Sequence, residues 1–545
     1  FMNSTTSSRK QIEKVSSDDQ VIGFDLFSQI TYMAILSRGG VTRDRLLEYC
    51  GRQRYLTSVF FEYINLMARS MGVEYTRAFQ AVAQRAKAPR VKSLLLRFSA
   101  SISSGSSESD FVLQEARAEA QRYSNDYERN VENLRKWTDA YAAILVAVTL
   151  IMVVSQVSSL LGSTSASFIY LMLFTLGGVT SVGVYLIYKV APFETITYDP
   201  VPGTTPDRKM AKFLFITCGP TGLGLGVMGF FMLSEMGVSP VTATSSIFGL
   251  TGISLLPSAF LAMRDATRVS NIDQELPVFL RAIGSIAGSG GVTLTEALRR
   301  IDTASYQYLK DPLERLRTRL ESGLPSGDCW EMFSRETGSE LVSRTSGMFV
   351  DGVEVGCNPG QIGEICSDYA QNISELRAKR KLTSSTFSFL TMAMHSVMAL
   401  ILVFVLEIII SFNSKLGSIA GVSDRENCLN QVVVPPGVEA AGIKLPRPEE
   451  LCASVDVFQM GNIGTLQTTI IVAVAILTVA NALAPKFSEG GNNLKIITFL
   501  AVTCLTSAVI MWGVPKVTAG LLSSPETGSG GLAMGIYSVV STGAI

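Results

Sequence analysis

The sequence predicts an all-α, polytopic membrane protein with about seven transmembrane helices and two duplicated helical-bundle domains in the cytoplasm. Three observations predict this class. Only 17% of the 545 residues are charged and 47% are hydrophobic, whereas soluble proteins carry about 25% charged residues. Several apolar segments are long enough to cross a hydrocarbon core of about 30 Å as helices. No alternating run of β-branched residues bounded by turn dipeptides indicates a strand.

The chain is expected to divide into eight parts. Residues 1–22 are polar and rich in serine and threonine, and we predict a disordered tail there. The other parts are a helical domain at 23–139, four transmembrane helices within 140–263, a second helical domain at 264–386, a fifth transmembrane helix at 387–412, a loop at 413–465, two transmembrane helices within 466–514 and a tail at 515–545.

The first helical domain is predicted from its periodicity. From Asp25 onward, apolar residues recur at three- and four-residue steps, which is the spacing of one helix face. Pro89 interrupts this run, and the pattern then resumes. A long helix from about Asp110 through Trp137 is polar on one face, and we expect it to continue into the first transmembrane helix.

The second helical domain ends in a basic collar that leads directly into the fifth transmembrane helix. The collar contains Arg377, Lys379, Arg380 and Lys381. The first domain ends similarly, at Arg135 and Lys136, before another apolar helix. This plan indicates a protein that transmits work done on its two domains by another protein into its membrane helices.

The placement of charge predicts the orientation in the membrane. The segment 1–139 has more basic than acidic residues, whereas 162–166 has no charge and 234–240 has only Glu235. Cytoplasmic loops carry the excess of Lys and Arg, so we place the amino terminus and both helical domains inside and the carboxyl terminus outside. The apolar segments used for this assignment are 140–161, 167–190, 211–233, 241–263, 387–412, 466–483 and 496–514.

The two helical domains are related by a constant offset. The sequence GGVT occurs at 39–42 and again at 290–293, and 290 − 39 = 251. A duplicated unit of domain plus spanning helix explains such coincidences, with glycines at helix ends and aromatics facing inward. The same offset relates Leu47 to Leu298, Gly72 to Gly323, Phe79 to Trp330, Phe98 to Phe349, Gly105 to Gly356 and Phe111 to Ile362.

The 413–465 loop is predicted to be external. It holds four basic and six acidic residues (4 − 6 = −2) and two of the eight cysteines, Cys428 and Cys452. An oxidising exterior favours pairing these two, and closing this loop would contribute on the order of 3 kcal/mol to local order. Two free thiols in a flexible loop are the alternative.

Several chemistries are not supported by the sequence. Basic and acidic residues balance at 46 each, so no overall field favours a nucleic acid. GLGVMG at 224–229 is a formal GxGxxG but lies in an apolar run, where glycines serve helix packing. No GxxxxGK[ST] motif and no catalytic or metal-ligand spacing is found, so we expect no enzyme activity, no cofactor and no metal.

Two ionisable residues lie within the predicted fifth transmembrane helix. His395 is the only histidine, and Glu407 lies about three turns further along. A helix-packing role is the plain interpretation of His395. An ion path through both residues, as in a secondary transporter, is the alternative, although transporters usually devote little chain to soluble domains.

Charged side chains on both domains suggest docking surfaces for a large cytoplasmic partner, because charge sets registry and association rate. A solvated helix face is the alternative for any one group. The candidates are Arg85, Lys87, Arg90, Lys92 and Arg97 in the first domain, and Arg299, Arg300, Arg315, Arg317, Arg319, Glu336, Asp351, Glu354, Arg377, Lys379 and Arg380 in the second.

Longer strings carry a resemblance to a known family. LPVFLR at 276–281, GGVTLTEAL at 290–298 and ETGSEL at 336–341 are the clearest. The sequence resembles the archaellum membrane platform family, within the superfamily that shares the type II secretion F domain. Further matching stretches are Trp330, 351–356, 377–380, 394–395, 97–98, 103–105 and 137–141.

The resemblance implies a platform at the base of a type IV pilus-like filament, in the cell membrane and as a homodimer. It implies docking of a hexameric motor ATPase that drives pilin-like subunits (archaellins) into the filament and rotates it, with other motor-complex proteins as further partners. An archaeal adhesive pilus uses related platforms and remains the alternative. The 413–465 loop departs from the family pattern.

Overall fold

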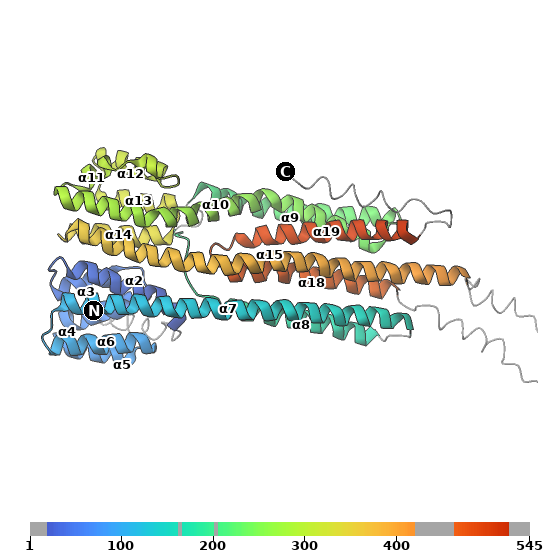
Figure 1. Ribbon diagram of the computed structural model, residues 1–545, viewed down its shortest axis with the longest axis horizontal. Helices are drawn as coiled ribbons and strands as arrows, with labels where there is room; N and C mark the ends of the chain where they lie inside the picture. The colour runs from blue at the N-terminus through green and yellow to red at the C-terminus, as the bar shows by residue number, and fades with distance from the viewer. Residues whose placement is uncertain (1–18, 162–165, 201–204, 420–462, 523–545) are drawn as a thin grey trace, which may run out of the picture.

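The computed structural model describes residues 19–161, 166–200, 205–419 and 463–522, and these are helical almost throughout (Figure 1). Within these ranges the one β-type pairing is an isolated bridge between Thr197 and Ser339. The predicted all-α class is therefore confirmed.

The first helical domain begins at Asp19, so residues 19–22 of the predicted tail are helical. Pro89 occupies the first turn of α6, where its missing N–H costs no hydrogen bond. Gly72 ends α4 in the left-handed conformation that glycine adopts without strain. The helices are α2 (Asp19–Ser37), α3 (Arg43–Arg52), α4 (Ser58–Met71), α5 (Tyr75–Arg85), α6 (Pro89–Ser103) and the first half of α7 (Glu108–Leu161).

The second helical domain repeats this order of helices. Shifting α6 by 251 residues gives the bounds of α14, and the start of α7 maps onto the start of α15. Left-handed glycines also recur at the offset, at 40 and 291, 72 and 323, and 105 and 356. The helices are the last part of α10 (Pro240–Gly290), α11 (Leu294–Arg300), the short η1 (Thr303–Ser305), α12 (Lys310–Glu321), α13 (Ser326–Thr337), α14 (Glu340–Glu354) and the first half of α15 (Pro359–Ile419).

Seven helices in the described ranges are long and apolar enough to span a membrane. Four of them are α8 (Ala166–Val190), α9 (Pro206–Glu235), α18 (Ile463–Glu489) and α19 (Lys495–Leu522). The other three are α7, α10 and α15, which leave the membrane part and continue into the helical domains (Figure 1). With 54 residues in α7 and 61 in α15, these helices are about 80 and about 90 Å long.

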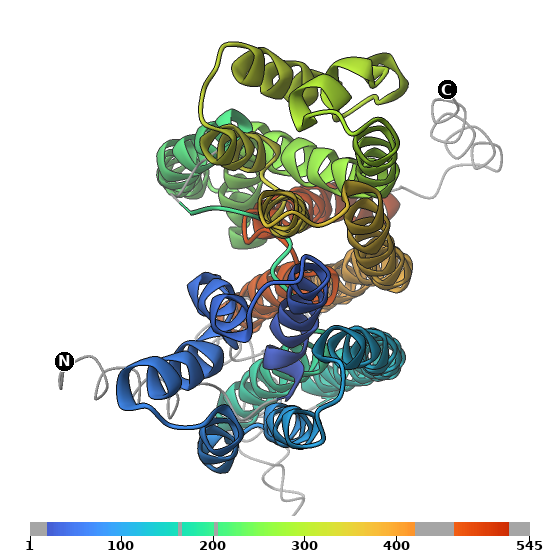
Figure 2. The same ribbon diagram turned by 90° about the vertical axis from the view of Figure 1, so that its left-hand side faces the viewer.

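The two helical domains lie side by side and share one apolar core (Figure 2). Phe27 of α2 contacts Tyr369 of α15 with ring centroids 4.8 Å apart, and also stacks on Tyr123 of α7. A repeated aromatic pair fills each domain, Phe79 with Phe98 and Trp330 with Phe349. A second core joins the spanning helices. The domains therefore pack as one body.

The glycines at 222–229 pack α9 against α10. A Cβ added at Gly226 would lie 2.7 Å from the Cα of Ile247, and one at Gly222 would overlap Ser254. Gly224 has no atom within 4 Å of such a Cβ. Two glycines four residues apart thus let the helices approach, which agrees with the packing interpretation of the motif.

Candidate functional site at the junction of the domains

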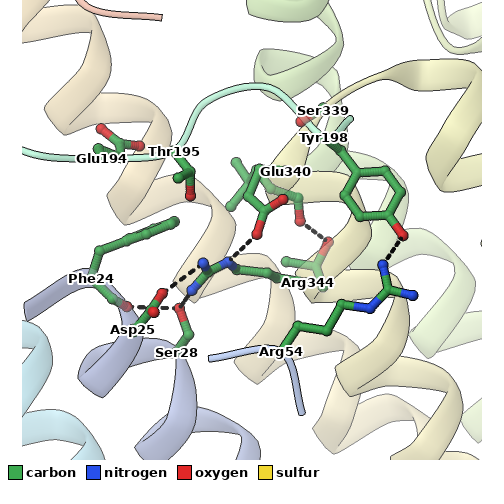
Figure 3. A network of polar contacts seen from close by, with 12 residues as sticks. Phe24, Asp25, Ser28, Arg54, Glu194, Thr195, Tyr198, Ser339, Glu340 and Arg344 are labelled. Carbon is green, nitrogen blue, oxygen red and sulfur yellow. Dashed lines mark hydrogen bonds and ion pairs between the residues drawn. The ribbon is translucent and has the colours of Figure 1, made fainter. Parts of the chain in front are cut away.

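A linker between α8 and α9 crosses the place where the two helical domains meet the spanning helices. Its residues 191–200 run along the end of α13 and the start of α14 (Figure 3). The N–H of Tyr198 donates to the carbonyl of Gly338 at 2.9 Å, and the N–H of Glu340 donates to the carbonyl of Ile196 at 3.1 Å. We call this linker, with Asp273, Arg344, Arg377 and Arg380, the junction.

Arg377 of α15 lies at the centre of the junction and bonds directly to α10 and to the linker. Its Nη1 is 2.5 Å from Oδ2 of Asp273 on α10, and its Nε donates to Glu194 of the linker. Tyr127 of α7 donates its hydroxyl to Glu194 at 3.2 Å, and Ser339 donates to Asp273. Burial raises the pKa of Asp273 to about 6, against the opposing effect of Arg377 and Ser339.

Arg344 of α14 joins the second domain to the first. Its Nη2 is 2.7 Å from Oδ1 of Asp25, its Nη1 donates to Ser28 at 2.8 Å, and its Nε donates to Glu340 at 2.8 Å (Figure 3). The guanidinium also lies 4.1 Å from the ring centroid of Phe24. Burial alone would lower the pKa of Arg344, but Asp25 and Glu340 outweigh it and raise the pKa. Arg344 therefore stays charged.

Two further contacts fix the linker and the domain interface. Arg208 and Asp265, each 1% exposed at the side chain, form an ion pair at 3.0 Å at the start of α9. Asp351 of α14 accepts a hydrogen bond from Tyr32 of α2 at 2.6 Å, so this predicted docking residue holds the two domains together. Burial raises the pKa of Asp351, although the hydrogen bond from Tyr32 opposes it.

Arg380 is buried where the linker meets the end of α18. Its Nε donates to the carbonyl of Ser488 at 2.9 Å and its Nη1 to the carbonyl of Pro192 at 2.8 Å. Arg377 and Arg380 thus lie inside the protein, where they hold segments together. Lys379, between them, is exposed and pairs with Glu128 of α7.

The basic stretch of the first domain separates into internal and exposed groups. Arg97 donates to both oxygens of Glu115 on α7, at 2.7 and 2.6 Å, and Arg90 pairs with Asp126 and with the buried Glu119. These two cations hold α6 against α7. The exposed cations of the stretch are Arg85, Lys87 and Lys92.

Most cations of the second domain are paired within it. Glu336 of α13 accepts from both Arg315, at 2.8 Å, and Arg319 of α12. Burial tends to raise the pKa of Glu336, but these two arginines outweigh burial and lower it. Arg317 lies 3.8 Å from Glu321 on its own helix.

Four predicted cations of the second domain, Arg299, Arg300, Arg315 and Lys379, and one carboxylate are exposed. Arg300 donates to Glu296 at 3.0 Å and Arg299 lies 3.8 Å from it, with both arginines more than half exposed. Glu354 is exposed at the end of α14. Arg315 of α12 and Lys379 of α15, although exposed, each pair with a carboxylate of a neighbouring helix.

Within the membrane part, His395 is buried and its ring nitrogens lie near three polar groups. Nε2 is 2.9 Å from Oγ of Ser507 and 3.3 Å from the carbonyl of Thr503, and Nδ1 is 3.3 Å from Asn481. These contacts tie α15 to α18 and α19, as the packing interpretation expects. The Oε1 atom of Glu407 is buried and has no hydrogen-bond partner among the residues described.

Cys428 and Cys452 lie outside the described residues. In the ranges that the structure covers, no group of three His, Cys, Asp or Glu side chains is placed to hold a metal ion.

Sequence reasoning missed Glu194, Asp273 and Arg344. The available signal was a charged residue at a core-facing position of a helix with otherwise small or apolar neighbours, as at Arg344 in ELVSRTSGMFV. Asp273 likewise lies among buried apolar residues of α10.

Comparison with known proteins agrees with this architecture. Residues 279–407, which form most of the second helical domain and its spanning helix, match the family model of the type II secretion system protein F. The second helical domain is therefore similar to an F domain. Since α2–α7 repeat its helices, the first domain has the same architecture.

The chain also resembles two curated relatives over most of its length. A flagella accessory protein J of Methanococcus voltae is 23% identical over 396 residues, which are 71% of each chain. A flagella accessory protein J of Methanocaldococcus jannaschii is 20% identical over 490 residues, 88% of this chain and 82% of the relative. The resemblance to the archaellum platform family is thus confirmed, and no solved structure matches the chain.

Proposed function

We propose that this protein is the membrane platform of an archaellum and couples a cytoplasmic motor to filament assembly and rotation. The observation that carries the proposal is the continuity of α7 and α15, each of which ends a helical domain and then spans the membrane without a break. The F domain and the flagella accessory proteins J support the same assignment.

In this proposal, a hexameric ATPase docks on the helical domains, which lie in the cytoplasm with the amino terminus. Its strokes move the domains, and α7, α10 and α15 carry that movement to archaellin subunits in the cell membrane. The platform itself needs no catalytic group. We favour the exposed cations Arg85, Lys87 and Lys92 of the α5–α6 turn, with Arg299 and Arg300 of α11, as the docking residues, because their charged groups lie at the protein surface.

Capture of the ATPase by the full-length protein in nanodiscs tests the docking surface. Charge reversal of Arg85, Lys87 and Lys92, or of Arg299 and Arg300, should weaken capture and make the remainder less dependent on salt. Lys516→Glu, at the far end of α19, is the matched control and should leave capture unchanged. If both charge-reversed variants keep their Tm and still capture the ATPase as well as the natural protein does, the proposed docking surface is wrong.

A further inference from the structure

A cavity of about 520 Å³ lies beside the junction, where three helices leave the membrane part. Its walls come from α10, α15, the linker, the start of α19 and the connection that precedes it, with Tyr127 of α7 and Glu489 of α18. Met263 is the last residue of the apolar stretch of α10, and Leu382 lies just before the apolar stretch of α15. The cavity is therefore at the level where the hydrocarbon core meets the headgroups.

The mouth of the cavity is apolar and open to the outside of the protein. Leu382 is 72% exposed and Met263 is 60% exposed, and both line the cavity. Phe499 of α19 and Val269 of α10 continue the apolar lining further in. Such a surface at membrane level is suited to a hydrocarbon chain entering from the side.

The cavity wall includes two cations without a carboxylate partner in the part of the chain that the structure describes, the buried Arg380 and the exposed Lys381, although the carboxylates of Asp273 and Glu489 also line it. Arg380 is 4% exposed and its hydrogen bonds run to carbonyl oxygens, which satisfy N–H groups but do not neutralise the cation. Among the residues described, no carboxylate oxygen lies within 4.0 Å of Arg380 or of the neighbouring Lys381. A buried charge normally has a counter-ion, because desolvation makes an isolated one costly.

Nearby cations add to this excess. Lys486 of α18 donates to Asn493 at 2.6 Å and likewise has no carboxylate within 4.0 Å in the described ranges. Lys495 of α19 lines the cavity and is neutralised by Glu489 at 3.0 Å. Arg377 and Asp273 also line it but already pair with each other. The cations here without a carboxylate partner in the described part of the chain are thus Arg380, Lys381 and Lys486.

We propose that this cavity binds one acidic phospholipid, with its phosphate at Arg380 and Lys381 and an acyl chain leaving between Met263 and Leu382. A bound anion supplies the missing counter-charge. Because the mouth of the cavity is apolar, this anion is the headgroup of a lipid. Basic pockets between transmembrane helices bind acidic headgroups in this way. The bound lipid bridges α10 and α15 beside the junction, so it stabilises their relative position. This inference requires membrane insertion and is independent of the proposed motor function.

Native mass spectrometry of the full-length protein tests the proposal, with phosphatidylglycerol and phosphatidylcholine supplied at equal concentration. The natural protein should retain one phosphatidylglycerol and gain Tm with it, but not with phosphatidylcholine. Lys381→Gln should bind phosphatidylglycerol about tenfold more weakly, as expected for the loss of one charge-assisted contact. Ser385→Trp, which fills the cavity from an exposed position on α15, should abolish retention.

Lys516→Gln is the matched control, because it removes one cation at the far end of α19 and should retain the lipid. Equal retention of both lipids, or retention unchanged in Lys381→Gln and Ser385→Trp, overturns the proposal. Displacement of the phospholipid by inorganic phosphate would also overturn the proposal, because the site would then bind a free anion. Neither variant alters Arg380, so a folding defect at that buried residue does not obscure the result.

Discussion

Arg344 of the second helical domain holds Asp25 of the first, with Nη2 and Oδ1 2.7 Å apart and both side chains almost fully buried. Glu340 shares the same guanidinium. One cation thus balances two carboxylates from different domains, and its position between the rings of Phe24 and Tyr55 excludes water. The contact makes the two domains depend on each other for stability.

Removing the Arg344 cation should lower the free energy of unfolding. Arg344→Ala leaves Asp25 and Glu340 buried and unpaired, and breaking such a pair typically costs about 3–5 kcal/mol. Thermal unfolding in detergent should show a large fall in Tm. Arg129→Ala removes an exposed pair with Asp126 and should cost only ~0–1 kcal/mol. Similar Tm values for the two variants would contradict a stabilising role for Arg344.

The stability of the junction should depend on pH through Asp273. Burial raises its pKa from 3.8 in the unfolded chain to about 6, so the folded state binds the proton more tightly. The contribution of Asp273 to the free energy of unfolding is therefore largest at low pH and declines as pH rises through this window. Against Asp273→Asn, which has no such titration, the natural protein should lose Tm between about pH 4 and about pH 6. A difference that is constant with pH would rule out this assignment.

The crossing of α10 and α15 should not tolerate a side chain. A Cβ at Gly363 would lie 2.7 Å from the Cα of Gly284 and 2.7 Å from the carbonyl of Leu280. Gly363→Ala should therefore cost about 1–3 kcal/mol through overpacking. Gly347→Ala on α14, where a Cβ meets no atom within 4 Å, should be neutral or stabilising by up to ~1 kcal/mol. Equal effects on Tm would mean that the helices can separate at this crossing.

An unbroken α15 should be needed for filament assembly but not for binding of the ATPase. Ala378 is exposed between the second domain and its span, and Ala378→Pro breaks the hydrogen bonds of the helix at that point. If the proposed function holds, cells with this variant should assemble few filaments although the ATPase is still captured. Ala378→Ser keeps the helix and should assemble filaments normally. Normal assembly by Ala378→Pro would show that the movement takes another route.

The sequence predicts the helices well and the junction poorly, for a physical reason. Helix bounds follow from local signals such as Pro89 at the start of α6 and Gly72 at the end of α4, and the repeat makes each signal occur twice. The partners of Arg377 are distant in the chain, and Glu194 is 183 residues away. Charge density alone cannot distinguish Arg97, which pairs with Glu115, from the exposed Lys92.

The Arg344–Asp25 contact occurs once although the helical unit occurs twice. At the 251-residue offset, the counterpart of Arg344 is Ser93 and the counterpart of Asp25 is Leu276. Two identical subunits related by a dyad would make this contact on both sides of the axis. The two halves therefore differ at this contact, so a partner that binds across both meets unlike side chains on the two sides.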